Sequence, residues 1–97
     1  CTLVSVGYLA AGTDFGTIDN DNTSVFAVTD GAGNSIVSKT YNTATQPTAS
    51  ALNDLGALDG TNKALTAGET VSLAITNGAT AKTPAGFLVV RFIPTNA

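Results

Sequence analysis

The sequence predicts a single all-β domain: a small β-sandwich or partly closed barrel of about five to seven antiparallel strands, with room for one short helical turn. Three observations support this fold class. Short runs rich in Val, Ile, Thr and Phe recur along the chain, and clusters of Gly, Asn, Asp and Pro separate them. The chain has 97 residues, which is enough for one domain with its own core, and residues 1–97 are predicted to form that single domain.

The first predicted strand covers residues 2–9, which are apolar and β-branched and end at an Ala-Ala-Gly sequence. Residues 13–22 follow and are rich in Asp, Asn and Gly. Because Asp and Asn side chains bond their own backbone and tolerate left-handed conformations, this segment is predicted to be a loop.

A β-hairpin is predicted next, with strands at residues 24–29 and 35–41. The five residues between them, DGAGN, include several suited to positive φ, as hairpin turns require. Residues 42–50 contain Thr, Asn and Pro47 without periodicity. They are predicted to be a long connection that crosses an end or an edge of the fold.

Residues 51–58 have leucine at every third position, which suits one or two helical turns, although a strand remains an alternative. Residues 65–69 are predicted to turn the chain into a strand at residues 70–76. In that strand apolar residues alternate with small or hydroxyl residues from Val71 to Ile75, the pattern of a half-buried strand.

The last predicted strand, residues 87–93, is apolar on both faces apart from Arg91. Strands of this kind usually lie in the centre of a sheet or between two layers, and we expect that position here. Pro94 ends the strand because it cannot donate a ladder hydrogen bond.

The composition excludes several classes of partner. Only 11% of residues are charged, against about 25% in typical domains. Four basic residues and a net charge of -3 provide no cationic footprint for phosphates, so nucleic acid is not an expected partner. No apolar run approaches the roughly 18 residues that span a bilayer, so a membrane is not expected either.

Cys1 is the only cysteine and His is absent, so neither an internal disulfide nor a Cys/His metal cluster is expected. The thiol is interpreted as incidental, with a lipid-bearing or inter-chain thiol as the alternatives. Because the chain begins with a strand-like segment and contains no Met, we expect that further residues precede Cys1 in the complete protein.

No catalytic residue or cofactor site is predicted. Without His, no obvious base can activate a Ser, Thr or Cys nucleophile. Lys39, Lys63 and Lys82 lie in polar surroundings typical of solvated lysines. The glycine-rich breaks lack the strand, turn and helix context of a phosphate-binding loop and are interpreted as turns.

Three carboxylates, Asp14, Asp19 and Asp21, fall within one predicted loop and could act as general acid and base or hold Ca²⁺. Residues 19–23 are similar to the opening of a calcium loop. The sixth position lacks the required Gly, however, and Asp30 stands where the bidentate Glu belongs. A loop held by Asx turns is therefore favoured over a metal site.

The aromatic residues lie mostly in predicted strands, where core packing is the expected role. Phe15 differs because it stands alone in a polar loop. It is interpreted as an exposed anchor for a partner.

An ordered set of short motifs covers nearly the whole chain. They comprise an early strand ending near Tyr8, an Asn-Thr step before a strand at residues 22–26, a Gly-centred hairpin, a Leu-rich stretch, LTAGETV at residues 65–71 and TPAGFLVV at residues 83–90. In this order, and with the charge-poor composition, the chain resembles the small head-decoration proteins of tailed bacteriophages.

This resemblance implies a non-enzymatic virion structural protein, a capsid decoration or cement protein on the outer capsid surface. Its partner would be the major capsid protein, whose neighbouring subunits it would bridge. Separately, the chain has few of the charges and prolines that usually block an exposed sheet edge, so pairing with a neighbouring subunit is expected, in a homo-oligomer with a trimer as the expected form. The candidate contact elements are the residues preceding Cys1 and the two predicted loops. The candidate contact residues in those loops are Phe15, Asp19, Asp21, Thr43, Gln46 and Pro47.

Two alternatives remain. A secreted bacterial adhesin or pilus-like structural subunit would have an equally natural Thr/Asn-rich β composition. A hydrolase using the carboxylates of residues 13–22 is the less favoured alternative.

Overall fold

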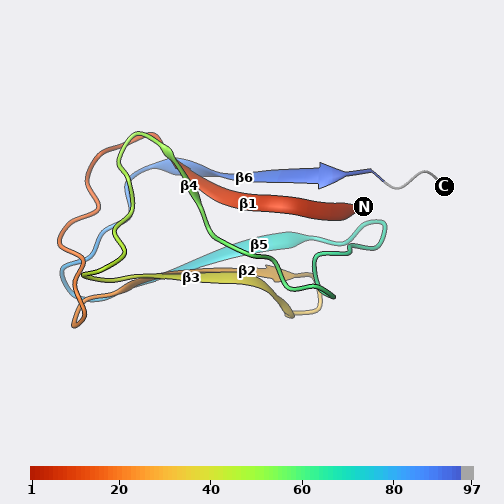
Figure 1. Cartoon of the computed structure of the whole chain (residues 1–97), viewed down its shortest axis with the longest axis horizontal. Helices are drawn as coiled ribbons and strands as arrows, with labels where there is room; N and C mark the ends of the chain where they lie inside the picture. The colour runs from red at the N-terminus through yellow and green to blue at the C-terminus, as the bar shows by residue number, and fades with distance from the viewer. Residues whose placement is uncertain (95–97) are drawn as a thin grey trace.

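Six strands build the molecule, which we describe over residues 1–94 from a computed structural model (Figure 1). They form two three-stranded antiparallel sheets, with strand orders β4-β1-β6 and β3-β2-β5. The strands are β1 (Thr2–Ala10), β2 (Ser24–Asp30), β3 (Ser35–Tyr41), β4 (Leu52–Asp54), β5 (Val71–Asn77) and β6 (Gly86–Ile93). The predicted all-β fold is therefore confirmed, in the form of a small sandwich. Residues 1–94 include no helix with the length and apolar character needed to cross a membrane.

The central strand of the first sheet, β1, directs alternate side chains into the core. Val6, Tyr8 and Ala10 are buried on its inner face. Between Leu3 and Ser5 a β-bulge places one extra residue in β1 relative to β6. The bulge resets the alternation, so Leu3 is buried while Val4 is 48% exposed.

The second sheet begins with the β2–β3 hairpin, whose turn is organised by Asp30. The Asp30 carboxylate accepts hydrogen bonds from the backbone N–H groups of Asn34 (2.9 Å) and Ala32 (3.0 Å). These bonds, the one from Asn34 above all, hold the pKa of Asp30 below its usual value. Gly33 has φ of 87°, which a residue without Cβ adopts readily. The predicted hairpin is thus confirmed, with its turn where the DGAGN segment lies.

An aromatic cluster connects the two sheets in the core. The ring of Phe26 on β2 is 1% exposed and lies edge-on to Tyr8 of β1, with centroids 5.1 Å apart. It also lies edge-on to Tyr41 of β3, at 5.6 Å. Edge-to-face pairs of this kind contribute about 0.5–1.5 kcal/mol each beyond the burial of the rings.

The two long sides of the sandwich differ. On one side, the chain after β4 crosses to the second sheet: Leu55 is buried, and the Asp59 N–H donates to the Ile36 carbonyl of β3 at 2.8 Å. Since β4 and β3 thus share this side, β6 and β5 lie on the other side, farther from the viewer in Figure 1.

That second side, between β5 and β6, is here named the open side. Its inward-facing residues are only half-buried although they pack against the core, in contrast to the fully buried residues of β1 and β2. These half-buried residues are Val71, Leu73, Ile75, Leu88 and Val90. The alternation predicted for β5 is confirmed by this pattern.

The helical turn suggested for residues 51–58 does not form, and the strand alternative is correct. β4 pairs with β1, with Leu52 opposite Leu9. The buried Asn53 amide explains the extended backbone, because its Nδ2 donates to the carbonyls of Tyr8 (3.3 Å), Thr48 (3.0 Å) and Ala51 (3.1 Å). These bonds tie the segment to β1, whereas the leucine spacing alone favoured a helix.

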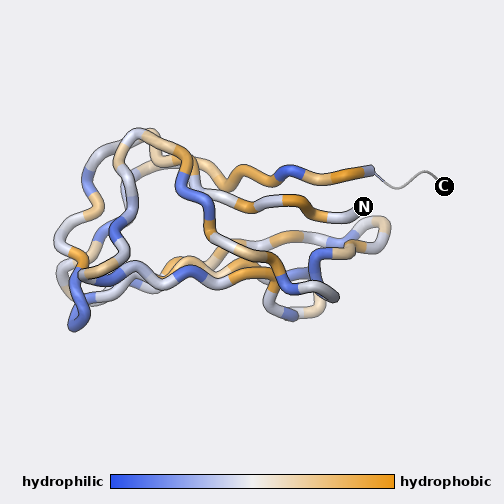
Figure 2. The backbone as a smooth tube through the Cα atoms, in the orientation of Figure 1, coloured by the Kyte–Doolittle hydropathy of each residue, from blue (hydrophilic) through white to orange (hydrophobic). Residues whose placement is uncertain are grey.

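The prediction that residues 87–93 form a central strand is wrong. β6 pairs only with β1 among the described residues and is therefore an edge strand. Phe87, Phe92 and Ile93 are 66%, 57% and 60% exposed. One face of β6 packs Leu88 and Val90 against the core, whereas Phe87 and Ile93 on the other face are exposed. Figure 2 shows the apolar residues that run along this strand.

Candidate functional site

The two loops predicted to contact a partner lie against each other at one end of the sandwich. The backbone N–H of Asn20 donates to Thr43 Oγ1 at 3.1 Å, and Gln46 Nε2 donates to the Ile18 carbonyl at 2.7 Å. Gln46 Nε2 also donates to the Asn42 carbonyl at 2.6 Å. Thr43 and Gln46 therefore join the two loops to each other, while their exposure leaves part of each side chain facing solvent.

Asp19 organises its own loop. Its Oδ1 accepts hydrogen bonds from the N–H groups of Asp21 (3.0 Å) and Asn22 (2.8 Å). The predicted Asx turn is thus confirmed at Asp19. Asp21 is exposed and Pro47 is half-buried, so the structure brings the predicted contact residues to one end without forming a single patch. In residues 1–94 no three His, Cys, Asp or Glu side chains are grouped as a metal site requires.

The interpretation of Phe15 as an exposed anchor is wrong. Its side chain is only 8% exposed and belongs to the hydrophobic core cluster, together with Ile18 and Ala81. The loop folds back over the end of the sandwich because the Lys82 N–H donates to the Phe15 carbonyl at 2.8 Å and Gly16 forms a bridge with Ala81. The polar residues next to Phe15 in the sequence therefore did not indicate that its ring is buried.

An apolar surface covers the outside of the β4-β1-β6 sheet. Leu52, Leu9 and Phe87 are directly paired across the three strands and are 53%, 38% and 66% exposed. Val89 and Ile93 continue the same face along β6, as the alternation of side chains requires. We name these five residues the apolar outer face: Leu9, Leu52, Phe87, Val89 and Ile93.

The outside of the other sheet has a different chemistry. Its outward positions on β5 and β3 are small or hydroxyl-bearing, among them Ser72, Ala74, Thr76, Ser38 and Thr40. Figure 2 shows the apolar residues along β6 interrupted by one hydrophilic position. The two outer faces of the sandwich therefore offer different surfaces to a partner. Within residues 1–94, only the β4-β1-β6 face carries large exposed aliphatic and aromatic groups.

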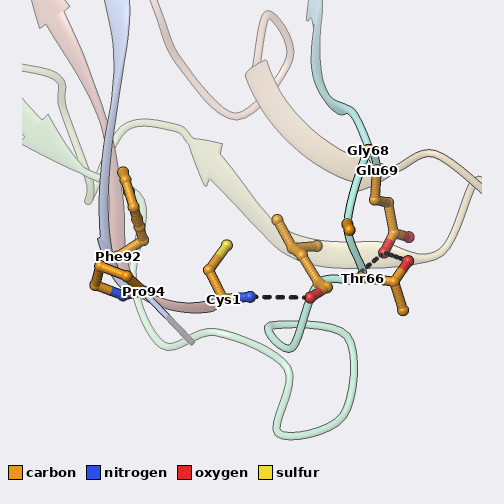
Figure 3. A pocket seen from close by; sticks show the side chains of 8 residues that line it. Cys1, Thr66, Gly68, Glu69, Phe92 and Pro94 are labelled. Carbon is orange, nitrogen blue, oxygen red and sulfur yellow. Dashed lines mark hydrogen bonds between the residues drawn. The ribbon is translucent and has the colours of Figure 1, made fainter. Parts of the chain in front are cut away.

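A pocket of about 670 Å³ opens at the end of the sandwich where β1 begins and β6 ends (Figure 3). Phe92 and Pro94 line one wall and the turn at residues 65–69 lines the other. That turn is held by Glu69, whose Oε1 accepts from the N–H (3.0 Å) and the hydroxyl (3.2 Å) of Thr66. Cys1 lies between the walls, and its amino group donates to the Leu65 carbonyl at 3.1 Å.

The ionisable groups in the described residues are mostly at the surface. Lys82 and Asp14 form an exposed pair, with Nζ and Oδ2 3.5 Å apart, and a pair of this kind adds little stability. The Gly16 N–H, and then the Lys82 charge, lower the pKa of Asp14. Burial, with a smaller effect from the Asp54 carboxylate, raises the pKa of Tyr41. These shifts have structural causes, since each group is engaged by its own turn or by the core.

Sequence reasoning missed the apolar outer face. Leu9 and Leu52 were assigned to a strand and to an ambiguous segment, with no indication that they pair across strands. The sequence feature that indicates such a surface lies in residues 87–93. Consecutive apolar residues in a strand are compatible either with burial of both strand faces or with one exposed apolar face. Only the strand order, which places β6 at an edge, decides between the two.

Protein-family models, curated proteins and solved structures were compared with the chain, and none matches it.

Proposed function

We propose that this chain is a non-enzymatic structural protein that acts by packing its apolar outer face against other protein surfaces. In its most specific form, the proposal is that it decorates the outside of a tailed-phage capsid and bridges neighbouring major capsid subunits. The observation that supports binding through this face is the in-register row of Leu52, Leu9 and Phe87, all exposed on one side of one sheet. The capsid as partner is supported by the sequence resemblance.

The energetics favour a role for this row. Fully burying an exposed Leu or Phe side chain contributes about 1.5–3 kcal/mol, at roughly 25 cal/mol per Å². Because Leu9, Leu52 and Phe87 are 38%, 53% and 66% exposed, covering each of them contributes roughly half of that amount. Two or three such side chains would supply a useful contact for one copy, and many copies on one lattice would strengthen it by avidity. The polar loops at residues 13–22 and 42–50 would then add peripheral hydrogen bonds around the apolar contact.

The test is binding to expanded capsids that lack decoration, measured by sedimentation and by cryo-electron microscopy. The unmodified protein is expected to bind at a fixed stoichiometry. The double variant L9N/F87N is expected to bind at least about tenfold more weakly, since a tenfold change corresponds to only about 1.4 kcal/mol. The matched control is Ala74→Asn, an exposed substitution on the opposite outer face that leaves the apolar outer face intact.

The outcomes separate the parts of the proposal. Absence of the unmodified protein from the particles would remove the capsid as partner. Equal weakening by Ala74→Asn would show that the apolar outer face is not the contact. Circular dichroism of each variant checks that the fold is retained.

A pilus-like or adhesin subunit is the second candidate, and one observation favours it. In the part of the chain that the structure describes, β5 and β6 each have one unpaired edge, with half-buried residues between them, the arrangement that accepts a strand from a neighbouring subunit. A secretory signal in the complete gene, or filaments assembled by strand exchange between subunits, would favour this candidate over the capsid proposal.

A further inference from the structure

The free edge of β6 offers a regular row of unpaired backbone groups. In an antiparallel pair, alternate residues direct their N–H and C=O toward the partner strand. The Ala11 N–H donates to the Ala85 carbonyl at 2.9 Å, which fixes the phase of the β1–β6 ladder. The backbone groups of alternate residues therefore form hydrogen bonds with β1, namely those of residues 87, 89, 91 and 93. The peptide groups of the residues between them point away from the sheet: Gly86, Leu88, Val90 and Phe92.

Nothing in the described residues protects this edge. Exposed edge strands are usually blocked by prolines, lysines, bulges or a covering segment. β6 contains no proline or lysine, and the bulge in this ladder lies in β1. The one charged residue of β6 is Arg91. Its backbone groups bond to β1 and its side chain lies on the outer face of the sheet, so it does not block the free edge.

The sequence of β6 is complementary to itself in one antiparallel register. If Val89 lies on a two-fold axis, Leu88 pairs with Val90 of the second copy, and Gly86 pairs with its Phe92. This register uses all four outward-directed residues, Gly86 included. On the outer face it sets Phe87 opposite the Arg91 of the second copy, where a guanidinium can lie over the ring.

Shifting the axis in either direction gives less favourable pairings in two cases. Moving the axis to Arg91 sets the two arginines directly opposite each other, and like charges in that position are destabilising. It also brings Leu88 opposite Pro94, which has no N–H to donate. Moving the axis toward Gly86 leaves Phe92 without a partner residue in the strand.

We propose that β6 pairs with β6 of a second copy in this register, centred on Val89, and joins the two three-stranded β4-β1-β6 sheets into one. The two open sides then face each other, so the half-buried Leu88 and Val90 of each copy become covered. The pairing also joins the two apolar outer faces into one surface. It goes beyond the proposed function, because it specifies how two copies associate whatever larger partner they bind.

Cysteine cross-linking in a Cys1→Ser background tests the register. Val89 would form a non-hydrogen-bonded pair with its own copy at a Cα separation of about 4.5 Å, within the range that a disulfide spans. Val89→Cys is expected to oxidise mainly to a covalent dimer. Arg91→Cys is the matched control on the same face, because two such residues would lie roughly 13 Å apart along the paired strands.

A mixture of Arg91→Cys and Phe87→Cys proteins completes the design, since these positions face each other across the axis. The mixture is expected to give the heterodimer, and neither protein alone to cross-link efficiently. Failure of Val89→Cys to cross-link, or equal cross-linking of Arg91→Cys alone, would overturn the proposed register.

Hydrogen exchange of the unmodified protein gives a test that depends on no variant. The amides of Leu88 and Val90 are expected to lose their fast exchange as the protein concentration rises. The outward amides of the other free edge, those of Leu73 and Ile75, serve as the internal control and are expected to remain fast. Protection of the β5 amides instead, or fast exchange of Leu88 and Val90 at every concentration, would refute the pairing.

Discussion

Removing the hydroxyl of Tyr8 tests how the start of β6 is held in place. The Tyr8 hydroxyl is buried and donates to the Pro84 carbonyl at 2.6 Å, across 76 positions of the sequence. This bond connects β1 to the turn that leads into Gly86 and hence into the edge strand. Tyr8→Phe removes the donor and keeps the ring, including its edge-to-face contact with Phe26.

The expected loss follows from the environment of the bond. A buried acceptor left without a partner costs about 1–3 kcal/mol, because it has already lost its water. For a domain of this size, each kcal/mol corresponds to a shift in melting temperature of about 4–8 °C. The melting temperature of Tyr8→Phe is therefore expected to lie well below that of the unmodified protein. The difference should exceed the roughly 0.5 kcal/mol that surface substitutions usually cause.

The assay is thermal and urea unfolding followed by circular dichroism, with Tyr41→Phe as the matched control. Tyr41 is also buried and also packs on Phe26, but its hydroxyl makes no hydrogen bond with the described residues. Tyr41→Phe is expected to change stability by less than about 0.5 kcal/mol. Equal effects of the two substitutions would refute the reasoning, since the Tyr8–Pro84 bond would then have no special role.

Three further predictions concern the core, a loop and the response to acid. Phe26→Ala is expected to cost about 3–5 kcal/mol in urea unfolding, because it empties the centre of the aromatic cluster; a cost under 1 kcal/mol would contradict the described packing. Gly16→Ala is expected to destabilise by about 1–3 kcal/mol in urea unfolding, and by more than Gly33→Ala. Both glycines have positive φ (66° and 87°), but at Gly16 a Cβ would also meet the Thr80 carbonyl, whereas Gly33 has open space around it. The pKa of Asp30 and that of Asp59 lie below the usual value because backbone N–H groups, chiefly those of Asn34 and Asn62, donate to them. Both carboxylates therefore stabilise the fold above about pH 4. The melting temperature is expected to stay constant down to about pH 5 and then to fall as the pH approaches the lowered pKa values of the folded protein. A melting temperature that rises on acidification would contradict this.

The strands and the hairpin could be predicted because their signals are local. In β5 each inward position from Val71 to Ile75 is apolar and each outward position is small or polar, which is the pattern of a half-buried strand. In the β2–β3 turn, Asp30 and Gly33 supply the hydrogen-bond acceptor and the positive φ that the turn requires. These features depend only on neighbours in sequence.

The candidate surface could not be predicted because it depends on distant pairings. Leu9, Leu52 and Phe87 become one row only when β4, β1 and β6 are placed side by side. Phe15 was misinterpreted for a similar reason, since its burial depends on a bond from Lys82. Strand order and loop docking are decided by packing across the whole chain, which residue patterns within one segment do not record.

The bulge in β1 has a consequence for how the chain tolerates changes in length. Val6 faces inward, and the extra residue allows Leu3 to face inward as well, although the two are separated by an odd number of positions. Deleting Val4 would shorten the strand to Thr2-Leu3-Ser5-Val6, in which regular alternation again turns Leu3 to the core. The same sheet should therefore accept the strand with or without this residue, and the position marks where a deletion of one residue leaves the rest of the molecule in phase.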